Sequence, residues 1–97
     1  MAQAESKLSR EIMAELRLDG HFCYKNHGNE YMMAGLPDIV CCAGGLFIGL
    51  ETKKLGKHGN TSARQDFVRD QIRAAGGIYE VVVSVADAKS VVARALR

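Results

Sequence analysis

A stripe of apolar residues at helical spacing marks the start of the chain. Leu8, Ile12 and Leu16 recur along one side of residues 4–18, which predicts an amphipathic helix. At about 100° per residue, Glu5 lies within about 20° of Ile12 on the same side of this helix. A carboxylate at this place is either a frayed helix end that reaches solvent or a site residue that points inward.

Two short apolar runs separated by glycine predict a β-hairpin in the middle of the chain. The runs cover residues 39–43 and 46–50, with Gly44-Gly45 between them. If the two glycines form the loop, Ala43 faces Leu46. Every other pair across the hairpin then follows from that register.

The same register places two acidic side chains opposite each other at the open end of the hairpin. Asp38 faces Glu51, with roughly 5 Å between their Cβ atoms, and Lys53 leaves the strand from the same face as Glu51. Adjacent carboxylates repel each other unless a cation lies between them, and hard oxygen ligands suit Mg²⁺ or Mn²⁺. A lysine beside such an ion can orient or deprotonate an attacking water, or neutralise charge on a phosphate.

Further periodic segments predict an α/β chain with the element order αβββαβα. We expect a strand at 21–25, a helix at 62–75, a β-branched buried strand at 78–85, and a last helix from Ser84 or Ala86. The strand–helix–strand unit implies a parallel crossover beside the antiparallel hairpin, so the sheet is expected to be mixed. The residues of the second helix expected to face the core are Phe67, Val68, Ile72 and Ala75.

Composition and charge narrow the class of protein. The 97 residues are expected to form one domain, residues 1–97, and the net charge of +2 does not by itself indicate a nucleic-acid-binding protein. Between residues 52 and 65, however, four basic residues occur without an acidic one: Lys53, Lys54, Lys57 and Arg64. This stripe is either a solvated loop or a phosphate-binding surface, and its position beside the carboxylates favours phosphate.

The cysteines and the N-terminus indicate a cytoplasmic protein. Cys23, Cys41 and Cys42 are too few and too irregularly spaced for a disulfide framework or a zinc site. All three are expected to be small buried residues in a reducing cytosol. The N-terminal residues lack the apolar run of a signal peptide, and no stretch approaches the length of a membrane span.

The order of these features resembles a known family. The segments that carry the resemblance are Gly35-Leu36-Pro37-Asp38-Ile39-Val40, the run from Gly44-Gly45 to Glu51-Thr52-Lys53, and the helix opened by Thr61-Ser62-Ala63-Arg64-Gln65. Together they are similar to the VRR-NUC domains (virus-type replication-repair nucleases) of the PD-(D/E)XK nuclease superfamily, over about residues 4–90. The resemblance implies a restriction-endonuclease-like αβββαβ core with a mixed sheet, flanking helices and an added C-terminal helix.

The resemblance also implies a function and a set of site residues. The function would be a Mg²⁺- or Mn²⁺-dependent endonuclease acting on branched DNA, such as Holliday junctions or flaps, in a bacterial or phage-infected cell. Catalytic roles would fall on Glu5, Asp38, Glu51, Lys53 and Gln65. The metal ligands would be Asp38, Glu51 and the backbone carbonyl of Thr52, with Glu5 acting through a water. The DNA contacts would be Lys54, Lys57, His58 and Arg64.

One residue has two interpretations under this resemblance, and another departs from the family pattern. Gln65 follows Ser62 at the spacing of a capping box, in which its amide would bond the backbone of Ser62 and be purely structural. As a family site residue it would instead bind phosphate or a metal-bound water, and a helix N-terminus favours an anion there. Thr52 departs from the family, which usually has a small β-branched or apolar residue before its lysine.

The same residues are compatible with two other functions and with assembly into a homodimer. The chain could be a DNA-binding module that keeps the fold without catalysis, or a small α/β protein in which the two acids and Lys53 form an ordinary surface network. The loop at 26–37 carries Tyr31, Met32 and Met33. These side chains either cap their own core or form the contact of a homodimer.

Overall fold

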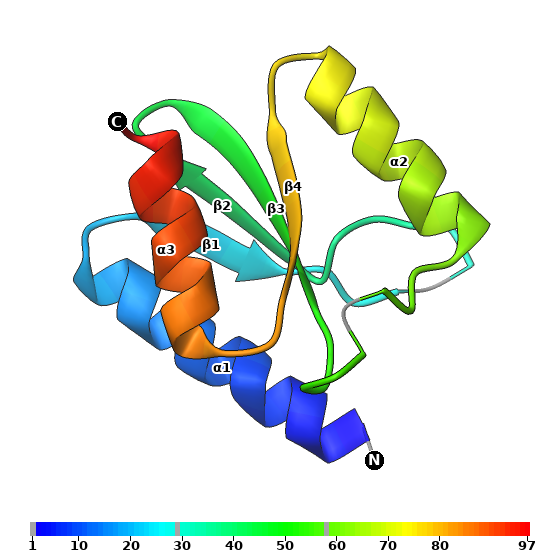
Figure 1. Ribbon diagram of the computed structural model, residues 1–97, viewed down its shortest axis with the longest axis horizontal. Helices are drawn as coiled ribbons and strands as arrows, with labels where there is room; N and C mark the ends of the chain where they lie inside the picture. Colours follow the sequence, from blue (N-terminus) through cyan, green and yellow to red (C-terminus); the bar gives the residue numbers. More distant parts are fainter. Residues whose placement is uncertain (1, 29, 58) are drawn as a thin grey trace.

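A four-stranded sheet with helices on both faces forms the framework of the protein (Figure 1). The computed structural model describes residues 2–28, 30–57 and 59–97, and the side chains within these ranges from residue 6 onward. The elements in chain order are α1 (Ala2–Leu18), β1 (Phe22–Lys25), β2 (Ile39–Ala43), β3 (Leu46–Thr52), α2 (Ala63–Ala74), β4 (Ile78–Val82) and α3 (Val85–Ala95). This is the predicted order αβββαβα, including the C-terminal helix.

The sheet has the predicted mixed topology. Its strand order is β1-β2-β3-β4, so strands that follow one another in the chain lie next to one another in the sheet. The first three strands are antiparallel, whereas β4 pairs in parallel with β3 after the crossover through α2. The hairpin register is also confirmed, because Ala43 pairs with Leu46 and Ile39 pairs with Leu50.

The hydrophobic core lies between the sheet and the helices α1 and α3, which cover the same face (Figure 1). Its buried members include Ile12, Leu16, Ile39, Cys41, Ile48, Leu50, Val82, Val91 and Val92. Removal of this apolar surface from water is the main driving force for folding. In the described part of the chain, no helix combines the length and apolarity needed to cross a bilayer.

The opposite face of the sheet carries α2, which packs over β4. Gly49 and Tyr79 are register partners on this face, and Pro37 packs against them. A Cβ atom built on Gly49 would lie only 2.7 Å from the Cγ of Pro37. Glycine at this position therefore lets the loop before β2 approach β3 closely, and that approach brings Asp38 beside the strand.

The prediction for the cysteines is correct for two of the three. Cys23 and Cys41 are buried, but Cys42 is exposed. Side chains alternate along β2, so Cys41 faces the core, whereas Cys42 faces the α2 side of the sheet at a part that α2 does not cover. All three are free thiols in this structure.

Two further expectations about packing and boundaries are wrong in part. Phe67 is 48% exposed and Ala75 is also exposed, whereas Val68 is the residue by which α2 enters the interior. The strand β4 ends at Val82 rather than at residue 85. Ser84 ends the extended segment because its hydroxyl caps α3, so the residues after it join the helix.

Replacement of Gly49 with alanine should lower the free energy of unfolding by about 1–3 kcal/mol, the range for overpacked interiors. The Pro37 ring cannot move away from the new Cβ without shifting the loop that carries Asp38. Urea unfolding followed by circular dichroism measures the change. Gly59→Ala is the control, because a Cβ there meets no atom within 4 Å. Equal stability of the two variants would contradict the close packing at Gly49.

Candidate active site

The open end of the β2–β3 hairpin brings Asp38 and Glu51 together. Asp38 immediately precedes β2, and Glu51 lies near the end of β3. One further step along the observed register, past Ile39 and Leu50, sets the two acids opposite each other as predicted. Thr52 and Lys53 follow Glu51 directly, so both acids and the lysine lie at the same end of the sheet.

Glu51 is a buried acid whose two oxygens have unequal surroundings. The residue is only 4% exposed. Its Oε2 accepts a hydrogen bond of 2.8 Å from Nε2 of Gln65 and lies 3.6 Å from Nζ of Lys53. Its Oε1 is buried and has no hydrogen-bond partner among the described residues. Because an unpartnered buried carboxylate oxygen is costly, a cation at this atom would stabilise the folded protein.

The surroundings of Glu51 change its acidity. Its pKa is raised from the ordinary 4.5 to about 7, mainly by burial and then by the negative charge of Asp38, while Lys53 acts in the opposite direction. Near neutral pH the Glu51 carboxyl therefore carries a proton for much of the time unless a cation takes its place.

Asp38 is held through one carboxylate oxygen. Its Oδ2 accepts two hydrogen bonds from Thr52, one from the backbone nitrogen at 3.0 Å and one from Oγ1 at 2.6 Å. Asn26 fixes the preceding loop, since its Nδ2 donates to the carbonyl of Pro37 at 2.7 Å and its backbone nitrogen donates to the carbonyl of Asp38 at 2.8 Å. Neither the Thr52 hydroxyl nor Asn26 was among the predicted site groups.

Gln65 makes the capping contacts that its structural interpretation predicts, and it also reaches Glu51, a contact that neither interpretation predicted. Its backbone nitrogen donates to Oγ of Ser62 at 3.1 Å, and its Oε1 accepts from the backbone nitrogen of Ser62 at 2.9 Å, which completes a capping box. Its Nε2 donates to Glu51, as described above. The cap and the contact to Glu51 are thus compatible, because the cap uses the amide oxygen and the carboxylate uses the amide nitrogen.

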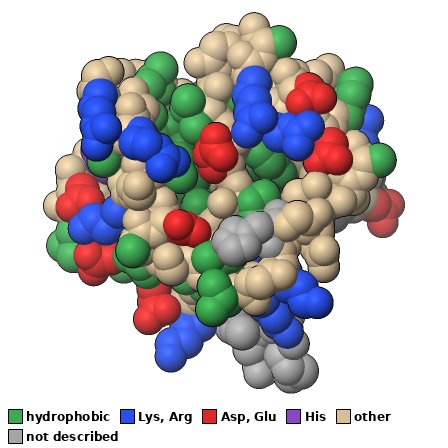
Figure 2. Space-filling view, viewed as in Figure 1, with side chains coloured by type: hydrophobic (Ala, Val, Ile, Leu, Met, Phe, Trp, Pro, Cys, Tyr) green, Lys and Arg blue, Asp and Glu red, His purple; other side chains and the backbone are tan. Residues whose placement is uncertain are grey.

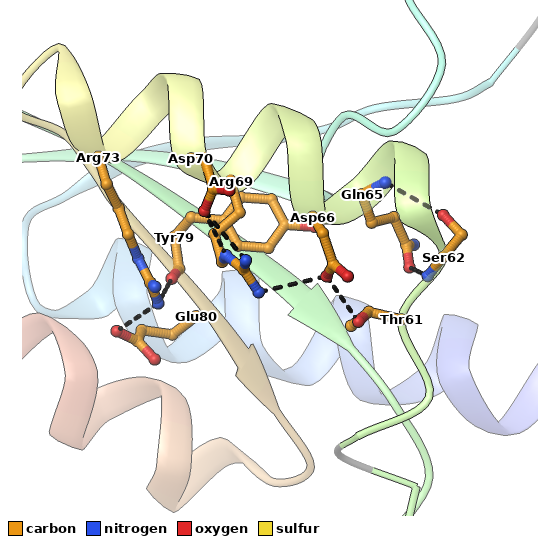
Figure 3. Close-up of polar contacts among 9 residues, drawn as sticks. All are labelled: Thr61, Ser62, Gln65, Asp66, Arg69, Asp70, Arg73, Tyr79 and Glu80. Carbon is orange, nitrogen blue, oxygen red and sulfur yellow. Dashed lines mark hydrogen bonds and ion pairs between the residues drawn. The ribbon is translucent and has the colours of Figure 1, made fainter.

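Polar contacts along α2 fix the helix that supplies Gln65 (Figure 3). At the C-terminal end, Nη2 of Arg73 donates to the backbone oxygen of Tyr79 at 2.9 Å, which joins α2 to β4. At the N-terminal end, Oγ1 of Thr61 donates to Oδ1 of Asp66 at 2.7 Å. The position of Gln65 over the sheet is therefore determined from both ends of the helix.

The predicted basic residues differ in exposure and contacts. Lys53 is half-buried beside Glu51, whereas Lys54 and Lys57 are exposed in the loop after β3. Arg64 is exposed but engaged: its Nε donates to the carbonyl of Ala34 at 3.2 Å, and its Cζ lies 5.0 Å from the centroid of the Phe67 ring. Arg64 therefore ties the loop before β2 to the first turn of α2, a role that its sequence position did not indicate.

Two predicted site residues fall outside what the structure describes. His58 is not among the described residues, and for Glu5 only the backbone, within α1, is described. Their assignment to the site remains a prediction.

Tyr79 is a buried polar residue that the sequence did not single out. It is 1% exposed, and its hydroxyl has no hydrogen-bond partner among the described residues. Its pKa is raised by burial first and then by the charges of Glu51 and Asp38, so the phenol lies within electrostatic reach of the acidic pair. In sequence it stands in a β-branched strand, where the pattern predicts a packing role for an aromatic residue.

Comparisons with known proteins establish the fold. No family model matches the sequence, and no curated protein matches it. A solved structure described as "VRR_NUC domain" is similar to this chain with a TM-score of 0.70 and 20% sequence identity, covering 93% of this chain and 95% of that one. This chain has a VRR_NUC fold. The predicted restriction-endonuclease-like core is thereby confirmed.

The donor atoms at the open end of the VRR_NUC sheet fit a hard divalent cation. No group of three or more His, Cys, Asp or Glu side chains suitable for a metal is found among the described side chains, which do not include those of Glu5 and His58. The candidate ligands are two carboxylates, from Asp38 and Glu51, and the backbone carbonyl of Thr52. Oxygen donors of this kind suit Mg²⁺ or Mn²⁺, and the buried Oε1 of Glu51 is the atom most in need of a cation.

Without metal, the free energy of unfolding should fall as pH rises from about 4.5 to about 7. The pKa of Glu51 is higher in the folded protein than in the unfolded chain, so the folded state binds more protons in this window and loses that advantage as pH rises. The loss is on the order of 3 kcal/mol. Urea unfolding in EDTA at pH 5 and pH 7.5 measures it.

Glu51→Gln separates this effect from the titration of other groups. The variant should lack the Glu51 contribution and be more stable than the wild type at pH 7.5, with a smaller difference at pH 5. Glu11→Gln, at an exposed position of α1, is the matched control and should follow the wild type at both pH values. A constant difference between Glu51→Gln and the wild type would contradict a raised pKa.

Proposed function

We propose that this chain is a divalent-metal-dependent endonuclease that hydrolyses phosphodiester bonds in branched DNA, such as Holliday junctions or flaps. The observation that carries the proposal is the buried Oε1 of Glu51, which lies opposite Asp38 and has no hydrogen-bond partner among the described residues. The VRR_NUC fold is consistent with a nuclease domain. A buried carboxylate beside a second acid, without a cation between them, would destabilise the fold, so the presence of Glu51 next to Asp38 argues for a catalytic role.

Each site residue would have a distinct part in the reaction. Asp38, Glu51 and the Thr52 carbonyl would hold Mg²⁺ or Mn²⁺, and Glu5 would join them through a bridging water. The ion, when bound, activates water and stabilises negative charge on phosphate oxygens. Gln65 holds Oε2 of Glu51, which would leave Oε1 free to bind the ion.

Lys53 would act on the attacking water or on the phosphate. Its Nζ lies 3.6 Å from Oε2 of Glu51, and its side chain is 18% exposed, so it reaches the edge of the site while remaining partly desolvated. There it would orient the water whose oxygen bonds to phosphorus as the bond to the leaving sugar oxygen breaks. It would also neutralise charge that builds on the phosphate.

The DNA contacts would come from the loop after β3 and the start of α2. Lys54 and Lys57 are exposed there, and His58 and Arg64 belong to the same stretch of chain. On the face of the molecule in Figure 2, by contrast, basic and acidic side chains are interspersed. A local basic segment of this size would contact few phosphates, which favours recognition of DNA shape over a long duplex footprint.

A homodimer would enlarge this footprint and is part of the proposal. Tyr31 is 90% exposed and Met33 is 47% exposed in the loop between β1 and β2, while Met32 is half-buried. Pairing of these loops about a two-fold axis would cover their apolar surface and set two sites against a four-way junction. Light scattering at micromolar concentration measures the mass, and a monomer at every concentration would contradict this part.

Asp38→Asn and Glu51→Gln should each reduce DNA cleavage by at least about 10²-fold, because each removes a charged ligand while keeping the side-chain shape. The assay incubates flap, fork, junction and linear DNA with Mn²⁺, Mg²⁺ or EDTA. Circular dichroism checks that both variants keep the fold.

Each outcome of this assay has a distinct meaning. Wild-type cleavage that survives in both variants would contradict the site assignment. Firm DNA binding by the wild type without cleavage in either metal would indicate the DNA-binding module instead. Absence of both DNA binding and Mn²⁺ binding would indicate an ordinary surface network of Asp38, Glu51 and Lys53.

Lys53→Ala should lower kcat by about 10²–10³-fold with little change in KM for DNA, because its role would lie in the transition state. Lys54→Ala is the matched control one residue away, and it should raise the Kd for DNA and reduce the salt dependence of binding by about one counterion. Steady-state kinetics and binding titrations at several salt concentrations measure both. A near wild-type kcat in Lys53→Ala would show that this lysine has no catalytic role.

A further inference from the structure

Thr52 is a polar residue on the core side of β3. Side chains alternate along the strand, so Thr52 shares its face with Ile48 and Leu50, both of which are fully buried, while Glu51 points to the other face. Thr52 itself is 1% exposed. A hydroxyl in such a place is unfavourable unless it is hydrogen-bonded, so its partners identify what it does.

The partners of Thr52 form a directed chain of hydrogen bonds. Oγ1 of Thr52 donates to Oδ2 of Asp38 at 2.6 Å, a short bond of the kind made to a charged acceptor. Oγ of Ser9, in α1, lies 3.4 Å from the same Oγ1, and Ser9 is fully buried. A hydroxyl has one proton, and that of Thr52 is used on Asp38, so Ser9 must be the donor to Thr52.

We propose that Ser9 and Thr52 are positioning residues for Asp38, and this rests on the proposed function. Two donors of Thr52, the hydroxyl and the backbone nitrogen, both bind Oδ2 of Asp38. They fix the rotation of the carboxylate and leave its other oxygen, Oδ1, for the divalent cation. Ser9 fixes the Thr52 hydroxyl in turn, so the helix α1 controls the geometry of a ligand on the far side of β3.

The expected change in Mn²⁺ affinity follows from the number of hydrogen-bond donors that hold Asp38. Loss of the Thr52 hydroxyl leaves Asp38 one donor, the backbone nitrogen of Thr52, so the carboxylate is loosened but not released. Groups that orient a metal ligand typically change metal affinity by about 10–100-fold. Thr52→Val should therefore weaken Mn²⁺ binding by about tenfold. Ser9→Ala acts one bond further away and should weaken it by about two- to fivefold.

Isothermal titration of the metal-free protein with Mn²⁺ tests the proposal without any activity measurement. Thr52→Val keeps the branched shape and removes only the hydroxyl, and Thr52→Ser restores the hydroxyl and should return the Kd to within about threefold of the wild type. Ser90→Ala is the matched control for loss of a hydroxyl, because Ser90 is exposed on α3 and its Oγ accepts a bond of 3.5 Å from Arg94, outside the carboxylate pair. It should leave the Kd for Mn²⁺ unchanged.

The outcomes separate this proposal from the proposed function. A folded Thr52→Val protein that binds Mn²⁺ as tightly as the wild type, or a Thr52→Ser protein that does not recover, would overturn the positioning role alone. If Thr52→Val does not fold, Ser9→Ala decides, and an unchanged Kd in that variant would overturn the role. A wild-type protein that binds no Mn²⁺ would overturn the proposed function and this inference with it.

Discussion

The two-glycine turn between β2 and β3 is the constraint on which the rest of the site depends. Gly44 and Gly45 have φ values of 57° and 79°, in the left-handed region that suits a tight hairpin turn. The turn sets the pairing of Ile39 with Leu50, and thereby the position of Asp38 opposite Glu51. A shift of one residue would turn one acid into the core, because side chains alternate between the two faces of a strand.

The two acids share a pattern of contacts that suits a cation more than a salt bridge. In each, protein donors bind one oxygen: Thr52 binds Oδ2 of Asp38, and Gln65 binds Oε2 of Glu51. Lys53 lies near the already occupied Oε2 of Glu51 and not at the buried Oε1. The raised pKa of Glu51 is the physical consequence, since burial and a neighbouring acid outweigh one lysine.

Helices on opposite faces of the sheet both reach this end of the hairpin. From the core side, Ser9 of α1 contacts Thr52, and from the other side Gln65 of α2 contacts Glu51. The close approach of Pro37 to Gly49 brings in the loop before β2 as a third support. Rigid elements on both sides of a strand can hold side chains more firmly than a loop alone, which is what a metal site requires.

Periodicity in the sequence was enough to predict the element order, the mixed sheet and the hairpin register. These features depend on local rules: apolar spacing, glycine at the turn, and Ser62 as a helix cap. The order of the sequence motifs around Asp38, Glu51 and Gln65 likewise indicated the fold. The hairpin register placed Asp38 and Glu51 at one end of the hairpin.

Tertiary structure decided which side chains meet. Alternation could not show that Cys42 lies on an uncovered part of the sheet, because coverage depends on where α2 packs. Nor could capping geometry show that Gln65 also reaches Glu51, since that contact joins residues from different elements. The Thr52 hydroxyl has the same origin: its partners, Ser9 and Asp38, lie 43 and 14 residues away in the chain. Contacts over such separations arise only from packing, and packing is a property of the whole fold rather than of any local pattern.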